Sequence, residues 1–176
     1  HPTMLETVLV NVVMPLGILA MFVAGGIAFY QRDLKRMLAF SSVSQIGYIL
    51  VGLSFMSSKG LTAAIIHLFN HGITKGLLFM CAGVIFLRYK ASFYKEISGL
   101  GRIMPWTSAA FLIGGLSLIG IPGTAGFISK WLLVQAALEQ GSWLIALAIL
   151  LSSLIAVLYV WQVTEIMYFG DSSKKG

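Results

Sequence analysis

The chain has 176 residues, of which 58% are hydrophobic and 10% are charged, and its mean hydropathy is +0.91. Soluble domains carry roughly 25% charged residues. This composition therefore excludes a soluble domain and indicates an integral membrane protein. The formal net charge of +6 comes mostly from residues between the apolar segments, which fits lipid headgroups and argues against a nucleic-acid partner. The single cysteine, Cys81, can form no disulfide within the chain and resembles no metal site.

Six apolar segments follow one another along the chain. They are apolar on all sides and longer than barrel strands, so they predict helices rather than a β-barrel. We therefore expect an all-α fold, a polytopic transmembrane bundle of about six spans with one discontinuous helix, in a single membrane domain over residues 1–176. The segments are expected at residues 7–30, 37–55, 61–87, 104–121, 125–138 and 142–168.

The first segment reads as a true span. The run Val8–Tyr30 is too long for the apolar part of a signal peptide and has no small-residue cleavage site. The chain begins His1-Pro2-Thr3-Met4 and enters this segment within a few residues. We expect the chain to be a piece of a longer protein, whose N-terminal half is a partner missing from this sequence.

The second segment carries a polar stripe in its first half. Ser41, Ser42, Ser44 and Gln45 are more natural facing a bundle interior than facing lipid. Such residues either hydrate a channel or hold helices together, so Ser41, Ser44 and Gln45 are possible lining residues of an ion path.

The third segment places His67, His71 and Lys75 at four-residue steps, which stacks them on one helical face about 6 Å apart along the axis. An ionisable group at mid-membrane costs on the order of 2.5–3.5 kcal/mol, so three in line need an explanation. Histidine titrates near neutral pH and a buried lysine binds and releases a proton as its surroundings change, which predicts a proton path. A zinc site is not expected, because no third ligand accompanies the histidine pair.

The sequence Ile121-Pro-Gly-Thr124 interrupts apolar sequence and leaves a short fifth segment that contains Lys130. Short hydrophobic segments interrupted by Gly or Pro point to discontinuous helices, whose freed carbonyls line ion sites in transporters. Lys130 is therefore a candidate for the same path. In the last segment, Glu165 either pairs with a path lysine or ends a helix near the headgroups, beside Tyr168.

The loops suggest an orientation. The break at 31–36 and the loop at 88–102 lie on one side and hold seven basic residues, whereas Lys59 lies on the other side. By the positive-inside rule the first side is cytoplasmic. Lys174 and Lys175 can be placed only if the fifth segment crosses fully.

Three motifs resemble the antiporter-like subunits of respiratory complex I, of Mrp-type multisubunit cation/proton antiporters and of membrane-bound hydrogenases. They are QRDLKRMLAFSSVSQIG at 31–47, H-x3-H-x3-KGLLF at 67–79 and GIPGTAGFISK at 120–130. Their order and spacing match over nearly the whole chain. Within this family, GGLSLIG at 114–120 and Lys130-Trp131 are most similar to the D-like group of Mrp subunits.

The resemblance implies a core of fourteen helices with two inverted five-helix repeats, each containing a broken helix. This chain would supply the C-terminal half of that core, one repeat and the helix before it. Lys75 would be the central lysine, His67 and His71 the linking histidines and Lys130 the broken-helix residue, where some members have glutamate. The resemblance also implies that the chain binds no flavin, iron–sulfur cluster or quinone, so no cofactor is expected.

Three functions remain open. The leading hypothesis is a proton-translocating subunit of an antiporter or NADH:quinone oxidoreductase-like complex, in a multi-pass protein of a prokaryotic cell membrane, with other membrane subunits and the lipid bilayer as partners. The first alternative is a non-conducting structural subunit whose polar residues form static pairs. The second is a redox-driven complex, a quinone oxidoreductase or hydrogenase, in which other subunits carry the redox chemistry.

Overall fold

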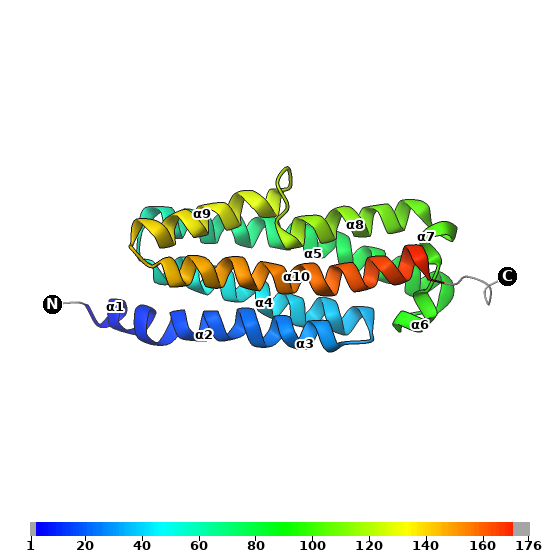
Figure 1. Cartoon of the computed structure of the whole chain (residues 1–176), viewed down its shortest axis with the longest axis horizontal. Coiled ribbons are helices and arrows are strands. Elements are labelled where there is room, and N and C mark those ends of the chain that lie inside the picture. The colour runs from blue at the N-terminus through cyan, green and yellow to red at the C-terminus, as the bar shows by residue number, and fades with distance from the viewer. Residues whose placement is uncertain (1–2, 171–176) are drawn as a thin grey trace.

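The computed structural model describes residues 3–170, and within that range it is helical with no named strand. The long helices run roughly parallel or antiparallel in one elongated bundle (Figure 1). Four of them are long and apolar enough to cross a membrane, which confirms an all-α transmembrane bundle. These four helical runs are Met4–Tyr30, Leu34–Ser54 (α4), Ser58–Tyr89 (α5) and Trp143–Phe169 (α10).

The first run contains two short π-helical stretches. It consists of α1 (Met4–Val8), η1 (Leu9–Val13), α2 (Met14–Leu19), η2 (Ala20–Ala24) and α3 (Gly25–Tyr30). The first stretch directly precedes the turn that contains Pro15, whose ring crowds the preceding carbonyls and whose nitrogen cannot donate. In the second stretch the carbonyl of Met21 accepts hydrogen bonds from Ser44 at 2.9 Å and from Ser152 at 3.3 Å. This widened turn therefore links three helices.

The fourth and fifth predicted segments form α8 (Pro105–Ile119) and α9 (Ala125–Glu139), which lie end to end (Figure 1). Each has 15 residues and is about 22 Å long, too short for a hydrocarbon core of about 30 Å. The two together have the length of one crossing, so the discontinuous helix is the pair α8 and α9 rather than α9 alone.

The predicted loop at 88–102 contains two short helices that the sequence did not suggest, α6 (Tyr94–Ile97) and α7 (Leu100–Ile103). At the start of α6 the Glu96 carboxylate accepts hydrogen bonds from the amides of Ser92 and Phe93, which caps this helix. This loop lies beside the turn at 31–33, since Tyr94 N donates to the Arg32 carbonyl at 2.9 Å. The two basic loops therefore share one end of the bundle, as expected.

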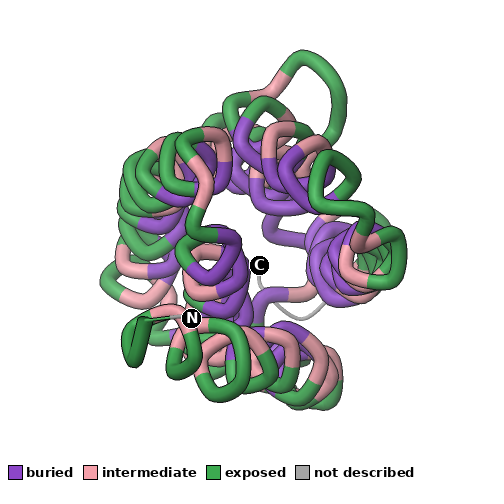
Figure 2. The backbone as a smooth tube through the Cα atoms, turned by 90° about the vertical axis from the view of Figure 1, so that its left-hand side faces the viewer, coloured by how far each residue is buried: buried purple, intermediate pink, exposed green. Residues whose placement is uncertain are grey.

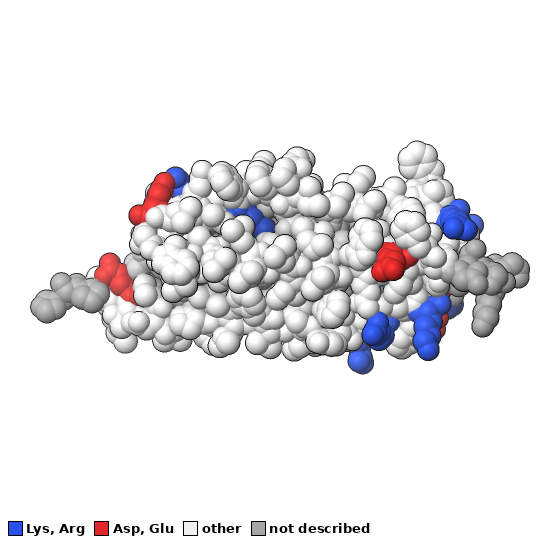
Figure 3. Space-filling view, in the orientation of Figure 1, with Lys and Arg blue, Asp and Glu red and all other residues white. Residues whose placement is uncertain are grey.

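Most charged residues on the visible face lie towards the two ends of the bundle (Figure 3). At the end opposite the basic loops, Lys59 forms an ion pair with Glu139. The C-terminal end of α10 lies beside the basic loops, where Gly99 N donates to the Ile166 carbonyl at 3.1 Å. Lys174 and Lys175, which the charge pattern could not place, lie outside the described residues.

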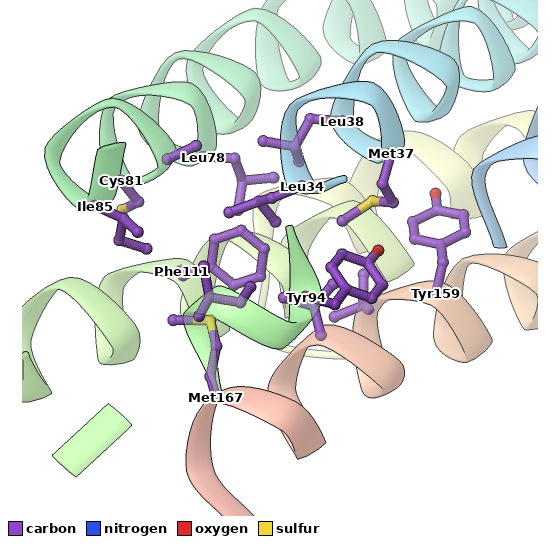
Figure 4. Close-up of a cluster of buried hydrophobic side chains, with 14 of the residues drawn as sticks. Leu34, Met37, Leu38, Leu78, Cys81, Ile85, Tyr94, Phe111, Tyr159 and Met167 are labelled. Carbon is purple, nitrogen blue, oxygen red and sulfur yellow. The ribbon is translucent and has the colours of Figure 1, made fainter. Parts of the chain in front are cut away.

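Two apolar clusters form the core, and the buried residues face the interior of the bundle (Figure 2). One cluster lies towards the basic loops and includes Leu34, Leu78 and Phe111 (Figure 4). The other lies towards the Lys59 end and includes Val51 and Leu133. On α4, α5 and α10 most buried polar residues fall between the stretches that feed the two clusters, whereas Ser54 and Thr164 lie within those stretches. The bundle therefore has a polar layer at mid-height between two apolar layers.

Candidate functional site

Lys75 lies in this polar layer and is 6% exposed. It comes from the middle of α5, and its ammonium reaches α4, where it donates to the Leu38 carbonyl at 2.8 Å and to the Ser41 hydroxyl. The Ser41 hydroxyl in turn donates to the same carbonyl at 3.0 Å. A buried ammonium needs such acceptors in place of water. Among residues 3–170, Lys75 has no ion-pair partner.

Lys130 lies where the discontinuous helix breaks and is 5% exposed. Its ammonium donates to the carbonyls of Leu118 at 3.0 Å and Ile119 at 2.9 Å. These are the last carbonyls of α8, which have no partner inside the helix and carry the negative end of its dipole. The break therefore creates acceptors for a buried cation, as the sequence predicted, and within the described residues this cation too lacks an ion-pair partner.

Two glycines make room for this arrangement. Gly120 ends α8 in the left-handed region at φ +89°, and a Cβ there would meet the Lys130 side chain at 2.9 Å. A Cβ on Gly126, in the first turn of α9, would lie 1.8 Å from the Ser117 carbonyl oxygen. Glycine at these positions lets the two half-helices approach closely enough for Lys130 to reach the end of α8.

His67 connects three helices and is 2% exposed. Its Nε2 lies 3.1 Å from the Gln45 amide oxygen, and its Nδ1 lies 2.8 Å from the Ser129 hydroxyl. In a neutral ring, Nε2 donates to Gln45 and Nδ1 accepts from Ser129. In a protonated ring both nitrogens donate, and Ser129 then donates to the Gly126 carbonyl, 3.1 Å away. Rotation of one hydroxyl thus satisfies both protonation states.

Tyr48 lies between His67 and Lys130. Its ring centroid is 5.4 Å from that of His67 and 4.6 Å from the Lys130 ammonium nitrogen, on the ring face. Its hydroxyl shares a 3.3 Å hydrogen bond with Ser153, which also accepts from Lys130 at 3.2 Å. His67 and Lys130 are therefore linked through Tyr48 and Ser153 without an acidic residue.

His71 is half-buried, and its ring stacks 6.4 Å from that of His67, nearly parallel to it. Its buried Nδ1 has no hydrogen-bond partner within residues 3–170. Beside it is a cavity of about 10 Å³ lined by polar residues that include Gln45, Thr74 and Ser117. A cavity of this volume with several polar groups has room for one water molecule.

The structure brings together most of the predicted residues: Lys75, His67, His71, Lys130, Ser41 and Gln45. It does not bring in Glu165, which is exposed on the outer side of α10 near its end. Ser44 instead donates to the Met21 carbonyl and joins helices.

The layer also contains residues that were not singled out in the sequence, among them Tyr48, Thr74, Ser117, Ser129 and Ser153. Tyr48 lies three residues after Gln45, so helical spacing was the available signal for it. Thr74 and Ser129 directly precede Lys75 and Lys130, and adjacent residues do not share a helical face, so spacing gave no signal for them. Ser117 and Ser153 lie in apolar sequence with no such neighbour, and only the packing identifies them.

Comparison with known proteins assigns the chain to a family. The family described as NADH:quinone oxidoreductase/Mrp antiporter, TM, matches residues 2–156. The NADH-quinone oxidoreductase subunit N of Desulforudis audaxviator is 40% identical, over 92% of this chain and 33% of its own length.

Solved structures show the same fold. A chain of the Mrp complex from Dietzia sp. DQ12-45-1b matches with a TM-score of 0.84 and 33% identity, over 90% of this chain and 30% of that chain. A chain of an archaeal membrane-bound sulfane sulfur reductase, a respiratory membrane complex, matches with a TM-score of 0.89 and 30% identity, over 94% and 34%. The particular similarity to the D-like group of Mrp proteins stays a prediction.

The chain thus spans about a third of the length of these relatives. A family match over most of its residues agrees with the discontinuous helix and the buried lysines described above. By this match, the chain belongs to the NADH:quinone oxidoreductase/Mrp antiporter transmembrane family.

Proposed function

We propose that this chain is part of a proton-translocating membrane subunit, in which Lys75 and Lys130 carry protons and His67 connects them. One observation carries the proposal. Two lysines are buried in the middle of an apolar bundle and, among residues 3–170, neither faces a carboxylate. A static structural lysine is normally paired, whereas one held only by carbonyls and hydroxyls can exist in either charge state.

The contacts suggest how protons would pass. Lys75 would release a proton through the Ser41 hydroxyl, which both accepts and donates. His67 would take up a proton on one ring nitrogen and release it from the other, because Gln45 and Ser129 hold the two nitrogens separately. Steps that lack a direct hydrogen bond would need water, and the small polar cavity beside His67 and His71 supports such a step.

The relatives guide the proposal for the whole protein. They are named as a subunit of a quinone oxidoreductase, an Mrp complex and an archaeal respiratory membrane complex. We accordingly propose a single membrane domain within a longer subunit, with other membrane subunits and the lipid bilayer as its partners. The six helical segments described above would form part of that domain.

Replacing Lys130 with methionine in the full-length subunit tests this function. Methionine keeps the apolar volume but cannot hold a proton, so proton transport should fall by about tenfold or more while the complex still assembles. The measurement is proton uptake into proteoliposomes that contain the purified complex, with subunit content checked by gel and mass spectrometry.

Lys59→Met is the matched control, because Lys59 forms a partly exposed ion pair at one end of the bundle. Its loss should leave transport unchanged. If Lys130→Met transports protons at the wild-type rate in an intact complex, the conducting function is wrong and the non-conducting scaffold is favoured.

A further inference from the structure

A second feature of Lys130 is not explained by proton transfer: it lines a pocket that opens on the outside of the bundle. The pocket lies between α9 and α10, beside the helix break, and has a volume of about 270 Å³. Lys130 is the one charged residue among those that line it. The walls are largely apolar and include Phe127, Trp131, Val134, Leu150, Leu154 and Val157.

The pocket opens on the outer surface of the described part of the chain. Trp131, Leu150 and Leu154 are each at least half exposed, so they form the mouth rather than part of the core. In Figure 3 a little blue is visible within a hollow of the white surface, well away from the charged ends of the bundle. Since α8 and α9 meet near the middle of the bundle (Figure 1), the mouth lies at the depth of the acyl chains.

The chemistry of the pocket selects its ligand. Apolar walls favour a hydrocarbon chain, and an ammonium without an ion-pair partner among the described residues favours an anionic or hydrogen-bond-accepting group at the end of that chain. The contact of Lys130 with Ser153, at 3.2 Å, is the longest of its three hydrogen bonds and the one to a side chain that can turn away. A carboxyl oxygen can take its place.

The depth of the pocket distinguishes between lipid classes. A phosphodiester headgroup stays charged and is held at the membrane surface, whereas a carboxyl group becomes neutral on protonation and so reaches the middle of the bilayer. We propose that this pocket binds a long-chain fatty acid, with the chain between α9 and α10 and the carboxyl group at the Lys130 ammonium. The binding does not depend on whether Lys130 carries protons.

Photolabelling tests the site in the full-length protein within its complex. The probe is a long-chain fatty acid with a diazirine on the chain, and labelled peptides are mapped by mass spectrometry. We expect labelling of the segments around Trp131 and Leu154, competed by unlabelled fatty acid. The methyl ester of the same probe, which cannot ionise, should label about tenfold less, since a charge-assisted hydrogen bond is lost. Phosphatidylcholine with the same chain should label no more than the ester.

Leu154→Trp fills the pocket without altering Lys130 and should reduce labelling by about tenfold while leaving proton transport in fatty-acid-free lipid unchanged. Leu158→Trp is the matched control, because Leu158 is exposed one turn further along α10 and does not line the pocket. Labelling should persist in Leu158→Trp and should fall in Lys130→Met. Equal labelling by acid and ester, or labelling that Leu154→Trp does not reduce, would overturn the proposal. Because the readout is labelling, failure of this site and failure of proton transport are separate results.

Discussion

Lys75→Met should reduce proton transport by about 100-fold or more, as expected when a group that donates and accepts protons is removed from a path. Its ammonium is buried in the polar layer and is held only by the Leu38 carbonyl and the Ser41 hydroxyl. Methionine has a similar length and no donor, so the route ends at this position. The measurement is proton uptake by proteoliposomes that contain the full-length subunit in its complex.

The same substitution should leave the protein as stable or more stable. A lysine at mid-membrane costs on the order of 2.5–3.5 kcal/mol, and an apolar residue of similar volume removes that cost. Thermal unfolding of the purified complex should therefore show an unchanged or raised Tm. This combination of lost transport and kept stability distinguishes a carrier from a structural residue. Lost assembly, or retained transport, contradicts the role given to Lys75.

Gly126→Val should destabilise the protein by about 3 kcal/mol, near the upper part of the range for overpacked sites. A Cβ at this position would lie 1.8 Å from the Ser117 carbonyl oxygen, so α8 and α9 must separate. Lys130 would then lose the Leu118 and Ile119 carbonyls, and transport would fall with stability. The checks are the yield and the Tm of the purified complex.

Gly26→Ala is the control for this substitution. Gly26 also lies within a helix, but a Cβ there meets no atom within 4 Å. Alanine is the better helix former, so the change should be neutral or slightly stabilising. If Gly126→Val folds as well as Gly26→Ala, the close contact at the helix break does not hold the two half-helices together.

The sequence predicted the helices well because each apolar run is long and bounded by Gly, Pro or charged residues. It also anticipated that the break at Pro122 would present free carbonyls to Lys130, since the end of any helix leaves carbonyls without partners. The helices α6 and α7 were missed because four residues are too few to show a period.

The partners of the buried groups could not be predicted in the same way. Three residues at four-residue steps drift by about 40° per step, so they need not face the same neighbour. His67 faces Gln45 and Ser129, whereas Lys75 faces Leu38 and Ser41. These pairings depend on how α4 and α9 pack on α5, which no local pattern encodes.

The measurement that most directly tests the route is proton uptake by a complex that carries His67→Phe, with both lysines intact. Phenylalanine fills the place of the imidazole and excludes water but cannot transfer a proton. We predict a loss of about tenfold or more, with assembly preserved, because His67 is the group that we propose connects Lys75 to Lys130. Transport at the wild-type rate would contradict this route, since protons would then pass without the group placed between the two lysines.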